Sequence, residues 1–388
     1  MRILHTSDWH IGRRFERESL EDDQRAFLAW LAAAVADEQV DLVLVAGDVY
    51  DRSQPAEDAV TLLDEGLDGL RAAGARVVVI PGNHDSARRL GFGAGRQALG
   101  GVHVFADDQH PPVPWTVAVG DERVRILAVP FLDPYGVPAP RDGADGTART
   151  RTHEHVLADA LESGRALLDP DDPSPTICIA HAYVSGAEES DSERALAVGG
   201  TDRVDPSLFA GFDYVALGHL HRPQRIGGDD SIAYSGSPLP YSFSEDHAKS
   251  VRLLELGSGG LTAVRTLPVP VGRPVVTLTG TLDELVTDAT LDRWHDYWVA
   301  ARLTDDTVRT QPMERLRERF PHAVSLRYQP TGEGSATAHG VDGATLEERP
   351  AEEVVVEFLT ELRGREPVPS ERALVRDALA RAIGAVVR

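Results

Sequence analysis

The chain has 388 residues, more than one domain usually contains, so its length predicts two or three domains. No apolar run approaches the roughly 20 residues that cross a bilayer, and the start MRILHTSD has a strand pattern and not that of a signal peptide, so we expect a cytoplasmic protein without a membrane segment. The net charge of −23 disfavours a free-standing nucleic-acid binder, and the single cysteine, Cys178, excludes an internal disulfide framework and a thiolate zinc site.

The first third of the chain has a βαβαβ pattern. Apolar runs at 3–6, 40–46 and 77–80 predict strands, and residues 20–36 and 56–73 between them predict helices. Open α/β sheets place their sites at the carboxyl ends of the strands. Polar residues that directly follow these runs are therefore candidate site residues.

The pattern continues to about residue 268. Residues 125–130, 176–180 and 214–217 predict strands, and 154–168 a helix. The stretches 137–150 and 186–205 have the composition of surface loops. We therefore expect a first domain over residues 1–268.

A second, smaller α/β module follows at 269–330. The predicted elements are strands at 275–280, 297–303 and 323–328 and helices at 282–291 and 313–320.

The end of the chain has a linker and a helical segment. Residues 331–349 have a linker composition, and 350–388 contain two helical patterns, 351–362 and 370–387. The two helices either fold back on their own domain or form a docking element for another protein.

Five short motifs carry the chemistry: SDWH, GDVYD, PGNHD, HAY and GHLH, each after an apolar run. Any one of them alone is weak, because turn chemistry or a core histidine would explain it. Asp8 and His10 are two positions apart, as are His219 and His221, so in extended chain each pair points the same way. The motifs together supply seven donors, namely Asp8, His10, Asp48, Asn83, His181, His219 and His221.

Carboxylate, amide and imidazole donors favour hard or borderline divalent ions such as manganese, iron or zinc. Two ions about 3.5–4 Å apart can hold both the attacking and the leaving oxygen of a phosphoryl displacement. The predicted reaction is metal-assisted phosphoester hydrolysis, with Asp48 bridging the ions. We assign Asp8, His10, Asp48 and His221 to one ion, and Asp48, Asn83, His181 and His219 to the other.

His84 is left outside the metal shell in this assignment. It could protonate the leaving oxygen or stabilise the developing negative charge. Asp51 and Asp85 are candidates for orienting the ligand imidazoles, or are ordinary turn carboxylates.

These motifs resemble those of the calcineurin-like metallophosphoesterase superfamily. A finer resemblance, to the SbcD family of nuclease subunits, rests on longer stretches between residues 5 and 245. They are HTSDWHIGRRF, AGDVYDRSQP, IPGNHDSARRL, SDSERALAVGG, DYVALGHLHRPQ and YSGSPLPYSFSE.

The resemblance implies an αββα sandwich with a small α/β capping domain and a C-terminal helical segment. It implies two divalent ions, manganese in such proteins, and a phosphodiester hydrolase acting on DNA as a 3′–5′ exonuclease and as an endonuclease on hairpins or single strands. It further implies a homodimer within a heterotetramer with the ATP-hydrolysing SbcC. No P-loop signature occurs in the chain, so ATP chemistry must come from the partner.

Two arginine clusters flank the first and third motifs and could contact DNA phosphates, or could be ordinary solvated surface. They are Arg13, Arg14 and Arg17, and Arg88 and Arg89.

Two other functions stay open. One is a phosphatase or phosphodiesterase acting on small molecules or phosphoproteins, and the other is a scaffold with a vestigial metal site, which the intact ligand set disfavours.

Overall fold

The computed structural model describes residues 1–141, 150–193, 203–329, 351–363 and 365–386. Contacts divide the chain into two units, Met1–Tyr328 and Gln329–Arg388. The predicted linker at 331–349 lies outside the described residues.

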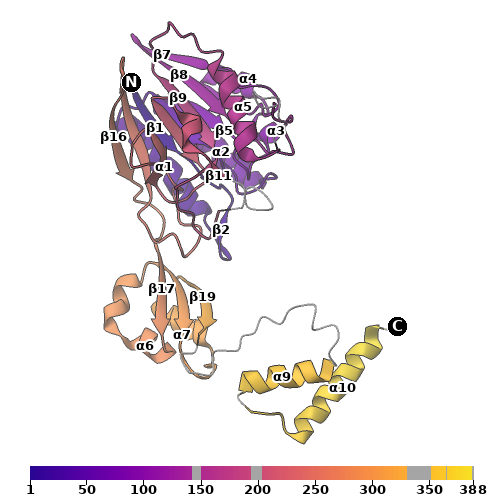
Figure 1. Cartoon of the computed structure of the whole chain (residues 1–388). Coiled ribbons are helices and arrows are strands. Elements are labelled where there is room, and N and C mark those ends of the chain that lie inside the picture. The colour runs from indigo at the N-terminus through magenta and orange to yellow at the C-terminus, as the bar shows by residue number, and fades with distance from the viewer. Residues whose placement is uncertain (142–149, 194–202, 330–350, 364, 387–388) are drawn as a thin grey trace. The chain divides into compact units, whose positions relative to one another are not determined.

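The first sheet of the larger unit combines a parallel core with an antiparallel edge, in the order β16-β15-β1-β4-β5-β6. Figure 1 labels β16, β1 and β5 of this sheet. The parallel strands are β1 (Arg2–Thr6), β4 (Leu42–Ala46), β5 (Arg76–Ile80) and β6 (Val102–Val104), and the antiparallel ones are β15 (Ser250–Gly257) and β16 (Gly260–Pro268).

The second sheet has the order β13-β14-β12-β9-β8-β7. Its strands are β7 (Trp115–Val119), β8 (Glu122–Val129), β9 (Thr176–His181), β12 (Tyr214–Gly218), β13 (Gln224–Arg225) and β14 (Ile232–Tyr234).

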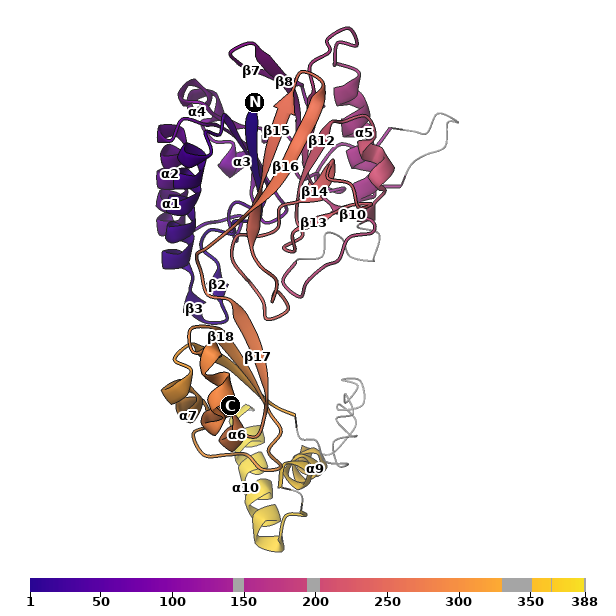
Figure 2. The ribbon, with the colours of Figure 1, turned by 90° about the vertical axis from the view of Figure 1, so that its left-hand side faces the viewer.

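Helices cover the outer faces of both sheets. In Figure 2, α1 (Glu21–Asp37) and α2 (Glu57–Ala72) lie on one side and α5 (His153–Arg165) on the other. The Thr152 side chain caps α5 by accepting the His155 N–H at 3.2 Å, which supplies one of the partners that the first turn of a helix lacks. Two short helices, α3 (Ala87–Leu90) and α4 (Ala94–Gly100), follow the third motif.

The apolar run of β4 is explained by burial on both faces. Val43 and Val45 pack with the helices, whereas Leu44 packs against the second sheet. Strands covered on both sides are continuously apolar, and truncating such a residue to alanine costs about 2–5 kcal/mol. The predicted αββα sandwich is confirmed.

A three-stranded parallel sheet follows, made of β17 (Val275–Gly280), β18 (Trp298–Leu303) and β19 (Ala323–Tyr328), with α6 (Leu282–Thr287) and α7 (Pro312–Arg319). Thr281 and Glu284 form a reciprocal capping box at the start of α6.

The helix predicted at 282–291 is wrong in its second half. The α-helix ends at Thr287, and Asp288 caps a separate 3-10 helix, η2 (Ala289–Trp294), by accepting the Thr290 N–H. An aspartate that accepts a backbone N–H two residues on competes with continuation of the helix.

Short elements complete the larger unit. They are β2 (Arg14–Phe15), β3 (Glu18–Ser19), β10 (Tyr183–Val184), β11 (Arg203–Val204) and η1 (Pro206–Phe209). The second unit contains α9 (Ala351–Arg363) and α10 (Pro369–Val386), joined by an ion pair between Arg376 and Glu352 at 3.2 Å. Within the described ranges, no helix is long and apolar enough to span a membrane.

Candidate metal centre

The seven predicted ligands lie at or just beyond the carboxyl ends of β1, β4, β5, β9 and β12. Asn83 is half-buried. The other six are at most 4% exposed, namely Asp8, His10, Asp48, His181, His219 and His221. The fold therefore brings all seven to one edge of the sandwich.

The backbone at this edge is unusual. Asp8, His10, Asp48 and His219 all have positive φ, at 54°, 44°, 49° and 110°. Two loops are joined there, because the Asp8 N–H donates to Gly47 O at 3.0 Å and the His10 N–H donates to Asp48 O at 2.9 Å. Non-glycine residues in this region store strain that commonly marks functional sites.

Glycine is required next to two of the ligands. A Cβ at Gly218 would lie 1.8 Å from Ala46 O, and one at Gly47, whose φ is +88°, would lie 2.3 Å from His181 Nδ1. The GD and GH pairs of the motifs thus allow the two sheets to approach at the site.

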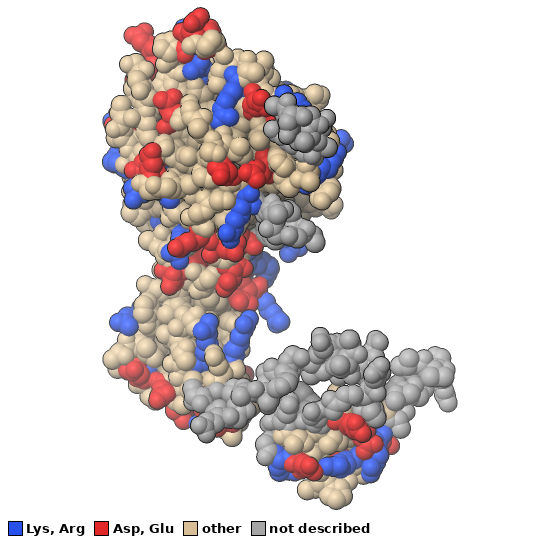
Figure 3. All heavy atoms as spheres, in the orientation of Figure 1, with Lys and Arg blue, Asp and Glu red and all other residues tan. Residues whose placement is uncertain are grey.

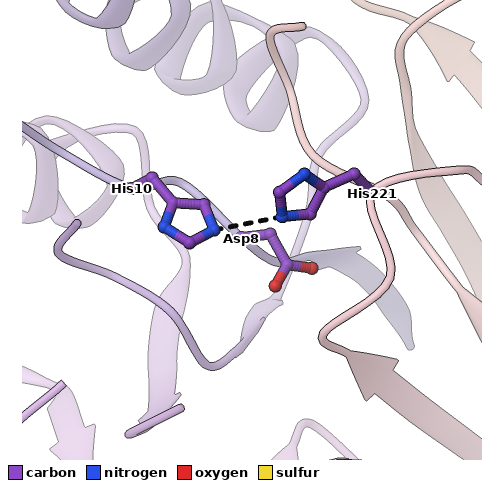
Figure 4. Close-up of side chains that lie close together, drawn as sticks. All are labelled: Asp8, His10 and His221. Atoms are coloured by element: carbon purple, nitrogen blue, oxygen red, sulfur yellow. Dashed lines mark hydrogen bonds between the residues drawn. The ribbon is translucent and has the colours of Figure 1, made fainter. Parts of the chain in front are cut away.

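Asp8, His10 and His221 form the first donor group, with ligand atoms within 4.8 Å of one another. Figure 4 shows the two imidazoles facing each other beside the Asp8 carboxylate, with the Nε2 atoms 3.1 Å apart. His10 Nδ1 is buried without a hydrogen-bond partner in the described structure. Two ring nitrogens at this distance need a proton or a cation between them.

Asp48, His181 and His219 form a second group. His181 Nδ1–H donates to Ala46 O at 2.9 Å, so Nε2 carries the free lone pair when the ring is neutral. That atom lies 2.9 Å from Asn83 Oδ1 and 3.5 Å from Asp48 Oδ2. With a neutral His181, the atoms that face each other are all acceptors, which suits a cation.

Asp48 stands between the two groups. Its Oδ2 is 3.7 Å from His10 Nε2 and 3.5 Å from His181 Nε2, while Oδ1 accepts the His84 N–H at 2.9 Å. One oxygen thus lies beside both candidate ion positions, which fits the predicted bridge.

The electrostatics favour positive charge at the site. Burial would raise the pKa of Asp48, but His181, His10 and His84 hold it well below its usual value. Burial would lower the pKa of His181, but Asp48 and Asp8 raise it to about 9. Burial raises the pKa of Asp8 to about 6, against the opposing effect of His181 and His221. A protonated imidazole takes the place that a divalent ion would fill, so the residues fit a dinuclear metal centre.

His84 lies at the border of the centre. With His10 and Asp48 it forms a third donor group, so proximity alone also admits it as a ligand. Its Nδ1–H donates to Asp51 O at 2.8 Å, and the residue is half-buried, unlike six of the predicted ligands. It is therefore the histidine of this cluster that a substrate reaches most easily.

Asp51 and Asp85 differ in what they hold. Asp51 O accepts from His84, which the assignment leaves outside the metal shell, and the Asp51 carboxylate pairs with Arg13 at 3.3 Å and lies 4.0 Å from Nδ1 of the predicted ligand His10. Asp85 instead accepts backbone N–H groups from Gly82, Val49 and Tyr50 at 2.9–3.0 Å. The expectation that Asp85 orients a ligand imidazole is corrected, because its two oxygens join the loops after β4 and β5.

Sequence reasoning missed the residues that hold His221. Its Nδ1 lies 3.1 Å from Glu245 Oε1 and 2.7 Å from Ser192 Oγ, and its N–H donates to Glu193 at 2.8 Å. These residues lie in the stretches SDSERALAVGG and YSFSE, which have no metal-ligand spacing of their own. The family resemblance of those stretches was the available signal.

The five arginines have different surroundings. Arg13 lies over the Tyr241 ring at 4.9 Å and pairs with Asp51 at 3.3 Å, so its side chain is fixed beside the site by these two contacts. Arg14 donates to Arg17 O, and both are exposed, as is Arg88. Arg89 is also exposed and donates to Ser53 O at 2.6 Å.

Two family models match the chain. The calcineurin-like phosphoesterase model matches residues 1–223, and the model described as the type 5 capsule protein repressor C-terminal domain matches residues 271–363.

Curated relatives extend over most of the chain. The SbcD subunit of nuclease SbcCD from Escherichia coli K12 is 33% identical over 370 residues, 91% of each chain. The protein of the same name from Rhodobacter capsulatus is 39% identical over 76% of each chain. The one from Staphylococcus epidermidis is 30% identical over 84% of this chain and 85% of its own. The chain therefore belongs to the calcineurin-like phosphoesterases and, within them, to the SbcD family of SbcCD nucleases.

Proposed function

We propose that this protein is the metal-dependent nuclease subunit of an SbcCD-type complex, hydrolysing DNA phosphodiesters in end processing, recombination and repair. The expected activities are 3′–5′ exonuclease on duplex ends and endonuclease on hairpins or single strands. The observation that carries the proposal is the convergence of seven donor residues in a chain matched over 91% of its length by a relative named a nuclease.

In this proposal Asp8, His10, Asp48 and His221 would hold one manganese ion, and Asp48, Asn83, His181 and His219 would hold the other. When bound, such ions supply Lewis acidity and a water of lowered pKa. His84 carries the proton chemistry of the chain itself: its Nδ1–H is held by Asp51 O, so Nε2 is the atom left to face the leaving oxygen, and the doubly protonated ring would donate its Nε2 proton there and become neutral.

DNA binding has to overcome the charge of the protein. The net charge is −23, and on the face shown in Figure 3 acidic and basic side chains of the described residues are interspersed. Exposed Arg14, Arg17, Arg88 and Arg89, the bound cations and the partner would therefore supply the attraction for phosphate.

We further propose a nuclease domain at 1–268, a capping domain at 269–330, a linker at 331–349 and an SbcC-docking segment at 350–388. The second family model, at 271–363, spans the capping domain and the first helix of the docking segment. A protein that acts on chromosomal DNA with an ATPase partner would work in the cytoplasm.

A homodimer within a heterotetramer completes the proposal. Phe92 and Val60 are 76% and 46% exposed and line one hollow of about 400 Å³ with Leu67 and Leu90, and Leu99 nearby in sequence is 90% exposed. A contiguous exposed apolar surface is typical of protein interfaces. Sedimentation of the wild-type and Phe92→Asp proteins would test whether this surface joins two copies.

The assay that tests the function compares substrates. Manganese-dependent cleavage of end-labelled linear duplex DNA, with and without SbcC, is set beside hydrolysis of a small phosphodiester and a phosphoprotein. Preference for DNA supports the nuclease. Preference for the small substrates would support the alternative phosphatase or phosphodiesterase, which the names of the relatives do not favour.

A further inference from the structure

The only lysine of the chain is buried beside the metal centre. Lys249 is 8% exposed and forms an ion pair with Glu245, which is 1% exposed. Neither residue belongs to the predicted ligand set. Two charges withdrawn from water need strong compensating contacts. The residues that contact Glu245 and Lys249 therefore indicate the role of the pair.

Glu245 is surrounded by donors. Its Oε1 lies 3.1 Å from His221 Nδ1 and accepts the Tyr241 N–H at 3.2 Å, and its Oε2 accepts from Ser237 Oγ at 3.2 Å. The Ser192 hydroxyl also donates to Oε1. The carboxylate is thus fixed on the ring of a predicted metal ligand.

Lys249 contacts His221 at its backbone carbonyl. Its Nζ is 3.4 Å from His221 O, where His247 Nε2 and the Ser237 N–H also lie, each at 3.1 Å. A further contact, to Ser237 Oγ at 2.9 Å, anchors the ammonium group. The pair therefore fixes His221 both at its ring and at its carbonyl.

We infer that Glu245 and Lys249 are positioning residues for one of the two metal ions. Glu245 holds the proton of His221 on Nδ1, so Nε2, 3.1 Å from His10 Nε2, presents its lone pair to the ion. Because the Glu245 carboxylate accepts the Nδ1 proton, it makes Nε2 of His221 a stronger donor to the ion. Lys249 limits this effect by offsetting the charge of the carboxylate. This inference rests on the proposed metal-dependent function.

The test measures Mn²⁺ binding to the full chain, by titration with detection of free Mn²⁺ by electron paramagnetic resonance, together with unfolding of the metal-free protein. Glu245→Gln is expected to weaken one of the two Mn²⁺ sites by about 10–100-fold and leave the other unchanged. Lys249→Met is expected to alter the same site. Lys249→Met also leaves the buried Glu245 carboxylate without its positive partner. If Lys249→Met does not fold, the double variant Glu245→Gln/Lys249→Met replaces it in the test.

Arg252→Met is the matched control. Arg252 is also a buried cation of this segment, with a side chain 6% exposed and an ion pair to Asp230 at 2.6 Å, but it contacts no predicted ligand. It should lower the stability of the metal-free protein and leave both Mn²⁺ affinities unchanged.

Wild-type Mn²⁺ affinities in folded Glu245→Gln and in the double variant would overturn the inference. If the wild-type chain itself bound no Mn²⁺, the proposed function would fail instead, so the two failures are distinguishable.

Discussion

The Nε2 atoms of His10 and His221 face each other at 3.1 Å, although 211 positions separate the two residues in the sequence. Both rings are buried, and they come from loops at the ends of different sheets. Such an approach is stable only when a proton or a cation lies between the nitrogens, so the fold brings the two rings together around a positive charge.

Replacing Asp48 should remove metal. Its Oδ2 is within 3.7 Å of an imidazole from each donor group, so Asp48→Ala takes a donor from both positions. Elemental analysis after dialysis should find fewer than two ions per chain, against two in the wild type. Asp68→Ala, exposed on α2, is the control and should keep both. Two ions retained by Asp48→Ala would disprove the bridge.

His84→Ala should keep both ions and lose activity. A group that moves a proton in the transition state contributes about 10²–10⁴ in rate. The turnover of DNA should fall by that factor at saturating Mn²⁺, whereas His110→Ala, with a side chain 77% exposed, should behave as wild type. Normal turnover by His84→Ala would eliminate the assigned role, and loss of an ion would make it a ligand.

Gly218→Ala should destabilise the protein strongly. The new Cβ would lie 1.8 Å from Ala46 O, so backbone must move where the two sheets meet. Urea unfolding should show a loss of about 3 kcal/mol. Gly95→Ala, with no atom within 4 Å of the added Cβ, should be neutral or stabilising. Equal stabilities of the two variants would show that the sheets are not in this close contact.

Acid should destabilise the fold through His5. Burial, with Arg252 nearby, lowers the pKa of His5 to about 3, and its ring bonds to Tyr214 Oη and Leu217 O. The unfolded state, with a histidine pKa near 6.5, binds more protons between these values, so stability falls as the pH drops below about 6.5, by up to about 1.4 kcal/mol per pH unit.

His5→Gln removes this titration. Its stability deficit relative to wild type, measured in urea, should shrink as the pH falls from about 7.5 to about 5. A deficit that stays constant over this range would mean that His5 does not titrate as its burial predicts.

Removing residues 351–388 should abolish binding to SbcC. The deleted segment contains α9 and α10, whereas all seven predicted ligands lie in Met1–Tyr328. Pull-down should therefore lose the partner while Mn²⁺ binding stays unchanged. Undiminished capture of SbcC by the truncated chain would place the docking surface elsewhere.

Sequence periodicity located the strands and helices that carry the motifs, because those runs are buried on both faces, as Leu44 and Val45 on β4 illustrate. It missed β15 and β16, which pair antiparallel at the edge of the first sheet. The pairing of β15 with β1 joins residues far apart in the sequence, which no local pattern encodes. The break at Asp288 was missed because its side-chain cap competes with an otherwise helical pattern.

The site residues likewise fall into those that the sequence could predict and those that it could not. Short motifs could indicate Asp8, His10 and Asp48, since metal donors at strand ends have a recognisable spacing. Glu245 and the backbone contacts of Asp85 depend on which loops meet in space, so no spacing rule could have found them. The ligand roles themselves remain predictions, which the metal-binding measurements test.

The most direct test of the central claim is the rate at which nucleotides are released from a linear duplex as Mn²⁺ is titrated, in the wild-type chain with SbcC and in Asp48→Ala with SbcC. Cleavage should depend on Mn²⁺ in the wild type, and the variant should stay inactive at every concentration. Equal rates in the two proteins, or cleavage by the wild type after complete chelation of divalent ions, would contradict a nuclease built on this centre.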